Sequence, residues 1–137
     1  GSKDYFEEVA EDWDQMRSDF FSPAVRERAY EVAGLKLDSV AADIGAGTGF
    51  VTEGLLKKGV KVIAVDQSPR MLEVIKDKFS DKGELECREG VAEDLPLEDE
   101  AVDYIFANMF LHHVKSPAET IKEMTRTLKE GGSEGET

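Results

Sequence analysis

The sequence predicts an α/β fold with a parallel sheet of about four strands, and two observations support this prediction. First, short apolar segments alternate along the chain with segments of helical periodicity, which is typical of helices that cross over a parallel sheet. Second, the glycine-rich turn of residues 45–49 joins an apolar segment to a helical one, as in nucleotide-binding α/β proteins. We therefore expect helices to cover the sheet.

The composition indicates a single globular unit. The 137 residues are 40% hydrophobic and 34% charged, and no apolar run approaches the ~20 residues of a membrane span. Seventeen basic and 30 acidic side chains give a net charge of −13, which would repel nucleic acids and anionic membranes. We expect neither as a partner. Because the chain has no secretory signal and a single cysteine, Cys87, we expect it to be cytoplasmic.

Two helices are expected ahead of the first strand. Apolar side chains recur every three to four residues over residues 4–16, which indicates an amphipathic helix. A second helix is expected from Pro23 toward Gly34, behind an N-cap at Ser22. We expect residues 1–34 to be a helical lead-in and residues 35–137 to be the α/β domain, together forming one globular unit.

The remaining elements are predicted from apolar runs and their periodicity. In the third strand Leu85 and Cys87 alternate with charged residues, so we expect an edge strand in which Cys87 faces the core. The last helix is expected to be closed by Gly131. The expected strands are 40–44, 60–65, 84–89 and 101–107, and the expected helices are 50–58, 70–79 and 117–129.

The glycine turn is predicted to bind a ligand. Asp43 at the strand end and glycines at 45, 47 and 49 give D-x-G-x-G-x-G, a spacing that conflicts with the G-x-G-x-x-G of NAD-dependent oxidoreductases. Glycine lets backbone N–H groups and a helix N-terminus approach a ligand. The next strand leads into Asp66, where doubly wound folds place an acid for ribose hydroxyls. The alternatives are a tight turn without ligand and a simple capped turn at Ser68-Pro69.

These segments resemble class I methyltransferases that use S-adenosylmethionine (AdoMet). Residues 40–50, 62–72 and 90–114 are similar to motif I, the post-I motif and motifs II to IV of that family, especially its ubiquinone- and menaquinone-biosynthesis branch. The resemblance implies a Rossmann-like three-layer sandwich with strand order 3-2-1-4. It also implies methyl transfer from AdoMet to a small-molecule acceptor, with S-adenosylhomocysteine as the product.

The resemblance further assigns residues to parts of the cofactor. Asp66 would bind both ribose hydroxyls. The methionine part would be held at the end of the first strand and in the following loop, by Asp43, Gly45, Ala46, Gly47 and Gly49.

The adenine end departs from the family pattern. Ala92 and its preceding neighbour lie where the family reads the adenine edge, but Val91 stands where relatives carry an aspartate. The contact to the adenine amino group would then come from Glu93, from the next acid or from water. Gln67 stands where relatives place an apolar side chain against the adenine face. Asn108, at the exit of the fourth strand, is the remaining cofactor-binding candidate.

The methyl acceptor side offers weaker candidates. Residues 108–114 lack the N-P-P-aromatic signature of enzymes that methylate amino groups of bases and glutamine, which favours a small-molecule acceptor. His112 and His113 titrate near neutrality, so either could be a base. Alternatively they cap the turn and pack beside the sheet. We expect no metal site, because adjacent histidines point apart and no third ligand is evident.

The C-terminal end is expected to be truncated. In the family a helix ending in L-K-x-G-G leads into strands 5 to 7, whereas here residues 128–132 carry this motif and only five residues follow. We expect no fifth strand, so residues 101–107 would be an open edge that forms a homodimer. Alternatively, a helix covers that edge. The truncation leaves a second hypothesis, an AdoMet-binding domain that is inactive or active only as an oligomer.

Overall fold

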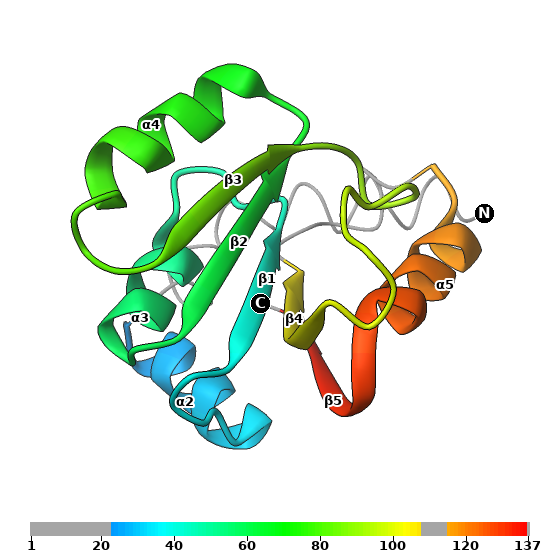
Figure 1. The fold of residues 1–137 in the computed structure, drawn as a ribbon, viewed down its shortest axis with the longest axis horizontal. Helices are drawn as coiled ribbons and strands as arrows, with labels where there is room; N and C mark the ends of the chain where they lie inside the picture. Colours follow the sequence, from blue (N-terminus) through cyan, green and yellow to red (C-terminus); the bar gives the residue numbers. More distant parts are fainter. Residues whose placement is uncertain (1–22, 108–114, 137) are drawn as a thin grey trace, which may run out of the picture.

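The computed structural model describes residues 23–107 and 115–136, which form a five-stranded sheet with helices on both faces (Figure 1). All neighbouring strands are parallel, in the order β3-β2-β1-β4-β5. The α/β class and the order of the first four strands are confirmed. The elements are α2 (Pro23–Ala33), β1 (Val40–Ile44), α3 (Phe50–Lys57), β2 (Lys61–Asp66), α4 (Pro69–Phe79), β3 (Leu85–Glu89), β4 (Val102–Ala107), α5 (Pro117–Thr127) and β5 (Leu128–Glu136).

The strands send alternate side chains into two buried clusters, because successive residues of a strand face opposite sides of a sheet. Figure 1 shows α3 and α4 on one side of the sheet and α5 on the other. Packed against α2, α3 and α4 are Ala41, Val62, Ala64, Tyr104 and Phe106. Packed with Met124 of α5 and with Leu95 and Leu97 are Ala42, Ile44, Ile63, Val65 and Ile105. The expected three-layer sandwich is therefore confirmed.

Two helices begin with a Ser-Pro pair in which the serine is the N-cap residue. Ser68 is the N-cap of α4, and its side chain accepts a hydrogen bond from the Met71 N–H at 3.3 Å, as the Ser68-Pro69 pair predicts. Ser116 caps α5 in the same way, accepting from the Glu119 N–H at 3.3 Å. Both helix starts are therefore fixed by local sequence.

Helix α2 is attached to the first turn of α3. The Arg26 guanidinium donates to the Phe50 carbonyl at 3.0 Å, and the Tyr30 hydroxyl donates to the Val51 carbonyl at 2.7 Å. Gly54 allows this approach, because a Cβ there would collide with the Tyr30 hydroxyl. The second helix of the expected lead-in therefore packs on the sheet domain. Residues 1–22 lie outside the described residues, so the first helix remains a prediction.

The expectation of no fifth strand was wrong, because β5 pairs with β4. Helix α5 stops at Thr127 and is not closed by Gly131. The Thr127 hydroxyl shares its hydrogen between the carbonyls of Glu123, at 2.9 Å, and Met124, at 3.2 Å, and the Leu128 N–H also donates to the Met124 carbonyl, so the last turn is closed here. Leu128 is already extended, with φ −77° and ψ 138°. From there the backbone pairs with β4, whose N–H and C=O groups on the side away from β1 would otherwise lack partners.

The position of β4 removes the basis of the expected homodimer. Within the part of the chain that the structure describes, β4 lies between β1 and β5, and the sheet edges are β3 and β5. Residues 101–107 are therefore not an open edge, and a strand rather than a helix covers them. No helix among the described residues is long and apolar enough to cross a membrane.

Candidate functional site

The candidate site lies at the carboxyl ends of β1 and β2. The chain runs from β1 to β2 and β3 on one side of the sheet and then crosses to β4 on the other side of β1. In open α/β sheets, ligands bind outside the carboxyl ends of the strands at such a reversal of strand order. The glycine loop, residues 45–49, leaves β1 at this point and leads into α3. The fold thus places the loop where a ligand is expected.

The glycine loop needs left-handed backbone at three positions. The φ angles are +69° at Gly45, +58° at Gly47 and +87° at Gly49, values that side chains other than glycine rarely adopt. The N–H groups of Gly45 and Ala46 donate to the Val65 carbonyl at 2.8 and 3.1 Å, which ties the loop to the end of β2. The D-x-G-x-G-x-G spacing therefore encodes a loop shape as well as access to the backbone.

Asp66 connects the glycine loop to the turn after β2. One carboxylate oxygen accepts from the Gly47 N–H at 3.0 Å and the other accepts from the Ser68 N–H at 2.9 Å. Each carboxylate oxygen can accept a further hydrogen bond, and the side chain is only half-buried. Asp66 is thus held in one orientation while keeping the capacity to accept from two hydroxyl groups.

Asp43 is a buried residue of β1, and its side chain contacts Thr52 of α3. Its Oδ2 accepts from the Thr52 hydroxyl at 2.7 Å, and its Oδ1 has no hydrogen-bond partner in the described structure. Burial raises the pKa of Asp43 to about 6; the Thr52 hydrogen bond opposes this shift, and the nearby charge of Asp66 adds to it. The sequence did not predict Thr52 as its partner, although a hydroxyl residue early in the following helix is a usable signal.

The unpartnered oxygen of Asp43 makes the site suitable for a cation. A buried carboxylate oxygen without a donor is costly, and an ammonium or N–H group that reached it would remove this cost. The loop above it is open at Gly47, where a Cβ would meet only the Gly45 carbonyl, at 3.9 Å. These features fit the ammonium group in the methionine part of AdoMet.

A second turn meets the site at Asp66. The Gly90 N–H donates to the Asp66 backbone carbonyl at 3.1 Å. Residues 91–94 then form a tight turn, closed by the Asp94 N–H donating to the Val91 carbonyl at 3.2 Å. Ala92 and Glu93 are half-buried within this turn, which we call the adenine turn after the part of AdoMet that the sequence resemblance predicts for it. The structure therefore connects this turn to Asp66. The neighbouring Gln67, by contrast, has an exposed side chain.

The remaining predicted residues divide into two groups. Asn108, His112 and His113 lie outside the described residues, so their roles stay predictions. Cys87 of β3 is half-buried and packs against the cluster under α3 and α4, and burial raises the pKa of its thiol, in keeping with a core residue. Among the residues that the structure describes, no group of three or more His, Cys, Asp or Glu side chains could hold a metal ion.

Comparison with known proteins identifies the fold and its family. Residues 42–133 match the family described as "Methyltransferase domain". An uncharacterized methyltransferase of Mycobacterium tuberculosis is 40% identical over 93 residues, covering 68% of this chain and 37% of that protein. The demethylmenaquinone methyltransferase of Staphylococcus saprophyticus is 37% identical over 110 residues, covering 78% of this chain and 47% of that protein.

A solved structure gives the same result. The SAM-dependent methyltransferase of Aquifex aeolicus, where SAM is AdoMet, superimposes with a TM-score of 0.70 at 26% identity. The match covers 90% of this chain and 67% of that one. The chain spans less than half the length of the two curated relatives just named.

Proposed function

Since this chain belongs to the methyltransferase-domain family and its cofactor is AdoMet, we propose that it transfers the AdoMet methyl group to a small-molecule acceptor. One relative is named for demethylmenaquinone, and another, from Oryza sativa, for 2-methyl-6-phytyl-1,4-hydroquinone. Both names refer to a quinone or a hydroquinone, and this supports a small molecule as the acceptor of the present chain. The acceptor itself and the cytoplasmic location stay predictions.

The observation that carries the proposal is the fixed carboxylate of Asp66. Because backbone N–H groups on both sides orient it, its free lone pairs can accept from the two ribose hydroxyls without reorganisation. The glycine loop would contact the methionine part, with Asp43 beneath it to receive the ammonium group. The adenine turn would present its backbone to the base. We assign cofactor binding to these residues on this basis.

Catalysis in this proposal is mainly a matter of alignment. Bound AdoMet supplies an electrophilic methyl group on a sulfonium, and the acceptor must attack in line with the departing sulfur. Holding the reactants in line can supply ~7–11 kcal/mol of the barrier. A carbanion or thiolate acceptor needs no base, whereas an oxygen or nitrogen acceptor does. His112 and His113 are the candidate bases for the second case.

A second candidate function takes account of how much of its relatives the chain covers. It spans 37–47% of the two curated relatives described above, so more than half of each relative lies outside the matched segment. In this alternative the chain binds AdoMet but transfers the methyl group only within a larger assembly. Methyl transfer from labelled AdoMet to a panel of quinols, phenols and thiols separates the two candidates, because only the first gives labelled product with the isolated chain.

Titration calorimetry tests the cofactor assignment. We expect AdoMet and S-adenosylhomocysteine to release or absorb heat on binding and NAD to give none. Binding of NAD without AdoMet would overturn the proposal.

Replacing Asp66 should weaken cofactor binding strongly. Asp66→Ala removes a charged acceptor, and a hydrogen bond to a charged group contributes about 1.5–3 kcal/mol, so the dissociation constant for S-adenosylhomocysteine should rise at least about tenfold. Asp66→Asn, which keeps one acceptor, should give a smaller loss. The matched control is Asp77→Ala on the exposed face of α4, which should bind like the wild type. Equal binding by Asp66→Ala and the control would remove the ribose assignment.

A further inference from the structure

Three consecutive carbonyl groups after the adenine turn are each held by an arginine. Arg126 of α5 donates to the Leu95 carbonyl at 3.2 Å and to the Leu97 carbonyl at 2.9 Å. Arg88 of β3 donates to the carbonyl between them, that of Pro96, at 3.0 Å. The side chains of Leu95 and Leu97 are buried in the cluster under α5. This segment, residues 95–97, is therefore fixed from both sides.

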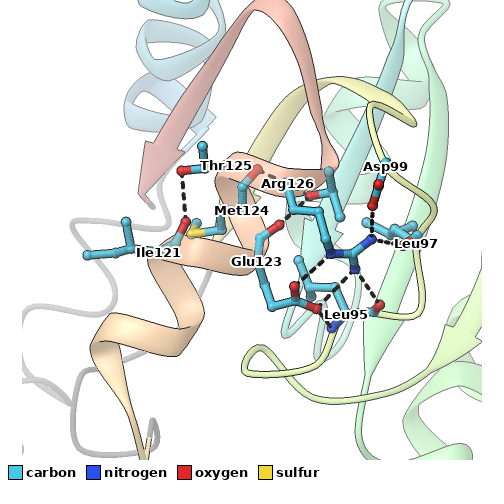
Figure 2. Close-up of polar contacts among 9 residues, drawn as sticks. Leu95, Leu97, Asp99, Ile121, Glu123, Met124, Thr125 and Arg126 are labelled. Atoms are coloured by element: carbon cyan, nitrogen blue, oxygen red, sulfur yellow. Dashed lines mark hydrogen bonds and ion pairs between the residues drawn. The ribbon is translucent and has the colours of Figure 1, made fainter.

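The arginine on α5 is itself oriented by a glutamate one turn earlier (Figure 2). Arg126 and Glu123 form a two-pronged pair, with nitrogen-to-oxygen distances of 2.7 and 3.0 Å. Glu123 also accepts from the Leu95 N–H at 2.8 Å, and Arg126 also donates to Asp99 at 2.8 Å. The hydrogen bond from Arg126 lowers the pKa of Glu123. The pair therefore binds both the N–H and the carbonyl of Leu95.

Residues 95–97 are connected to both ends of the adenine turn. At the far end, Leu95 follows the turn directly and is bound by the Glu123–Arg126 pair. At the near end, Gly90 packs against the Pro96 ring, where a Cβ on Gly90 would lie 2.6 Å from the proline Cδ. Gly90 in turn donates to the carbonyl of Asp66. The position of residues 91–94 relative to Asp66 thus depends on where segment 95–97 is held.

We propose that Glu123 and Arg126 are positioning residues for adenine recognition. Both residues lie on α5, and from there they hold residues 95–97 in place. The backbone of the adenine turn then contacts the base at a set distance from the ribose site. This inference rests on the proposed function, because it presumes that AdoMet binds along Asp66. An exposed ion pair on a helix would contribute little, but this pair also holds backbone groups of a loop, which a surface pair does not.

The test compares two ligands that differ only in the base. S-adenosylhomocysteine carries adenine, and S-inosylhomocysteine carries hypoxanthine, which replaces the exocyclic amino group by a carbonyl. We expect the wild type to prefer the adenine ligand. In Arg126→Gln the dissociation constant for the adenine ligand should rise about tenfold, with little change for the hypoxanthine ligand, because a mispositioned turn loses its preorganisation. The dissociation constant for the hypoxanthine ligand divided by that for the adenine ligand should therefore fall about tenfold.

A matched control separates positioning from general stability. Arg28 and Glu31 on α2 form a pair with the same three-residue separation, at 3.0 Å, but both side chains are largely exposed. Arg28→Gln should leave both dissociation constants and their ratio unchanged. A variant that is only less stable would raise both constants by one factor and preserve the ratio. If Arg126→Gln does not fold, Glu123→Gln, which retains an acceptor for the Leu95 N–H, takes its place.

The outcomes distinguish this inference from the proposed function. A wild type that binds neither ligand overturns the proposed function and the inference with it. A wild type that binds S-adenosylhomocysteine but does not discriminate between the bases overturns adenine reading by the turn. A wild type that discriminates, with an unchanged ratio in the Arg126 and Glu123 variants, overturns the inference alone.

Discussion

At the residue scale, the carboxyl group of Asp43 combines burial with an incomplete set of partners. It is fully buried, one of its oxygens has no donor in the described structure, and its pKa is raised to about 6 from 3.8. The folded state therefore binds more protons than the unfolded state between these two pH values. The stabilisation from protonated Asp43 is complete below pH 3.8 and is lost as the pH rises through about 6.

This gives a pH-dependent difference between the wild type and Asp43→Asn. From pH 4 to pH 8 the free energy of unfolding of the wild type should fall by about 2 kcal/mol relative to the variant, which cannot ionise at this position. Urea denaturation at several pH values measures it, and subtracting the variant cancels the other carboxylates. The exposed Asp77→Asn should instead track the wild type. A constant difference between wild type and Asp43→Asn would contradict the raised pKa.

The same group predicts how cofactor binding depends on pH. A ligand ammonium near Asp43 favours the ionised carboxylate, so affinity for S-adenosylhomocysteine should increase as the pH rises through about 6 and then level off. Asp43→Asn should lose this step and bind more weakly above it. Calorimetric titration between pH 5 and pH 8 tests this, and an identical profile in both proteins would exclude Asp43 from the site.

At the scale of elements, the junction of the glycine loop and α3 is shaped by close packing against α4. A Cβ on Gly49 would lie 2.7 Å from the Phe79 ring and 3.3 Å from Ile75, and its φ of +87° disfavours any side chain. A Cβ on Gly47 would meet only the Gly45 carbonyl, at an ordinary contact distance of 3.9 Å, although its φ is also positive, at +58°. The two glycines therefore serve different purposes, since Gly49 allows helix packing and Gly47 allows access to the loop.

Alanine substitutions should separate these purposes. Gly49→Ala should lower the free energy of unfolding by about 2–4 kcal/mol, from overpacking together with backbone strain, whereas Gly47→Ala should lower it by only about 1–2 kcal/mol from strain. Gly47→Ala should nevertheless weaken S-adenosylhomocysteine binding, because its new methyl group stands above the loop. Urea denaturation and calorimetry provide the two measurements. Equal destabilisation by both variants would contradict the packing argument.

At the scale of the whole molecule, β5 extends the sheet beside β4, an apolar strand. Its residues pair with Tyr104 to Ala107 of β4, three of which are buried almost completely. An apolar strand with unpaired backbone groups is a template for association with another chain. The pairing with β5 thus protects the most hydrophobic strand on this side of the sheet.

Removing the paired part of β5 should therefore cause self-association. A variant that ends at Glu130 keeps the pairing of Leu128 with Val102 but loses the pairing along residues 104–107. We expect its sedimentation coefficient to increase with protein concentration, while the full chain shows a smaller dependence. Circular dichroism checks that the variant is folded. A folded variant that stays monomeric over a wide concentration range would show that β4 does not cause self-association when its edge is exposed.

The sequence by itself determined the elements whose signals are local. Apolar runs and helical periodicity predicted β1 to β4 and α2 to α5 with small boundary errors, and the glycine spacing and the Ser68-Pro69 cap predicted the turns at the site. These signals work because residues next to one another in the chain set the backbone angles and the helix caps. The combination of the loop with Asp66 was predicted from the place where doubly wound folds put an acid after the second strand, and the structure joins the two by a hydrogen bond.

Only the tertiary structure decided the features that depend on distant partners. The polar, glycine-rich residues of β5 have little strand propensity of their own, and they are extended because β4 offers them unpaired backbone groups. Likewise, nothing local marks Arg126 as a residue that holds loop carbonyls 29 and 31 positions away. In both cases buried backbone groups must find hydrogen-bond partners, and which partner is near becomes known only once the sheet and its layers have assembled.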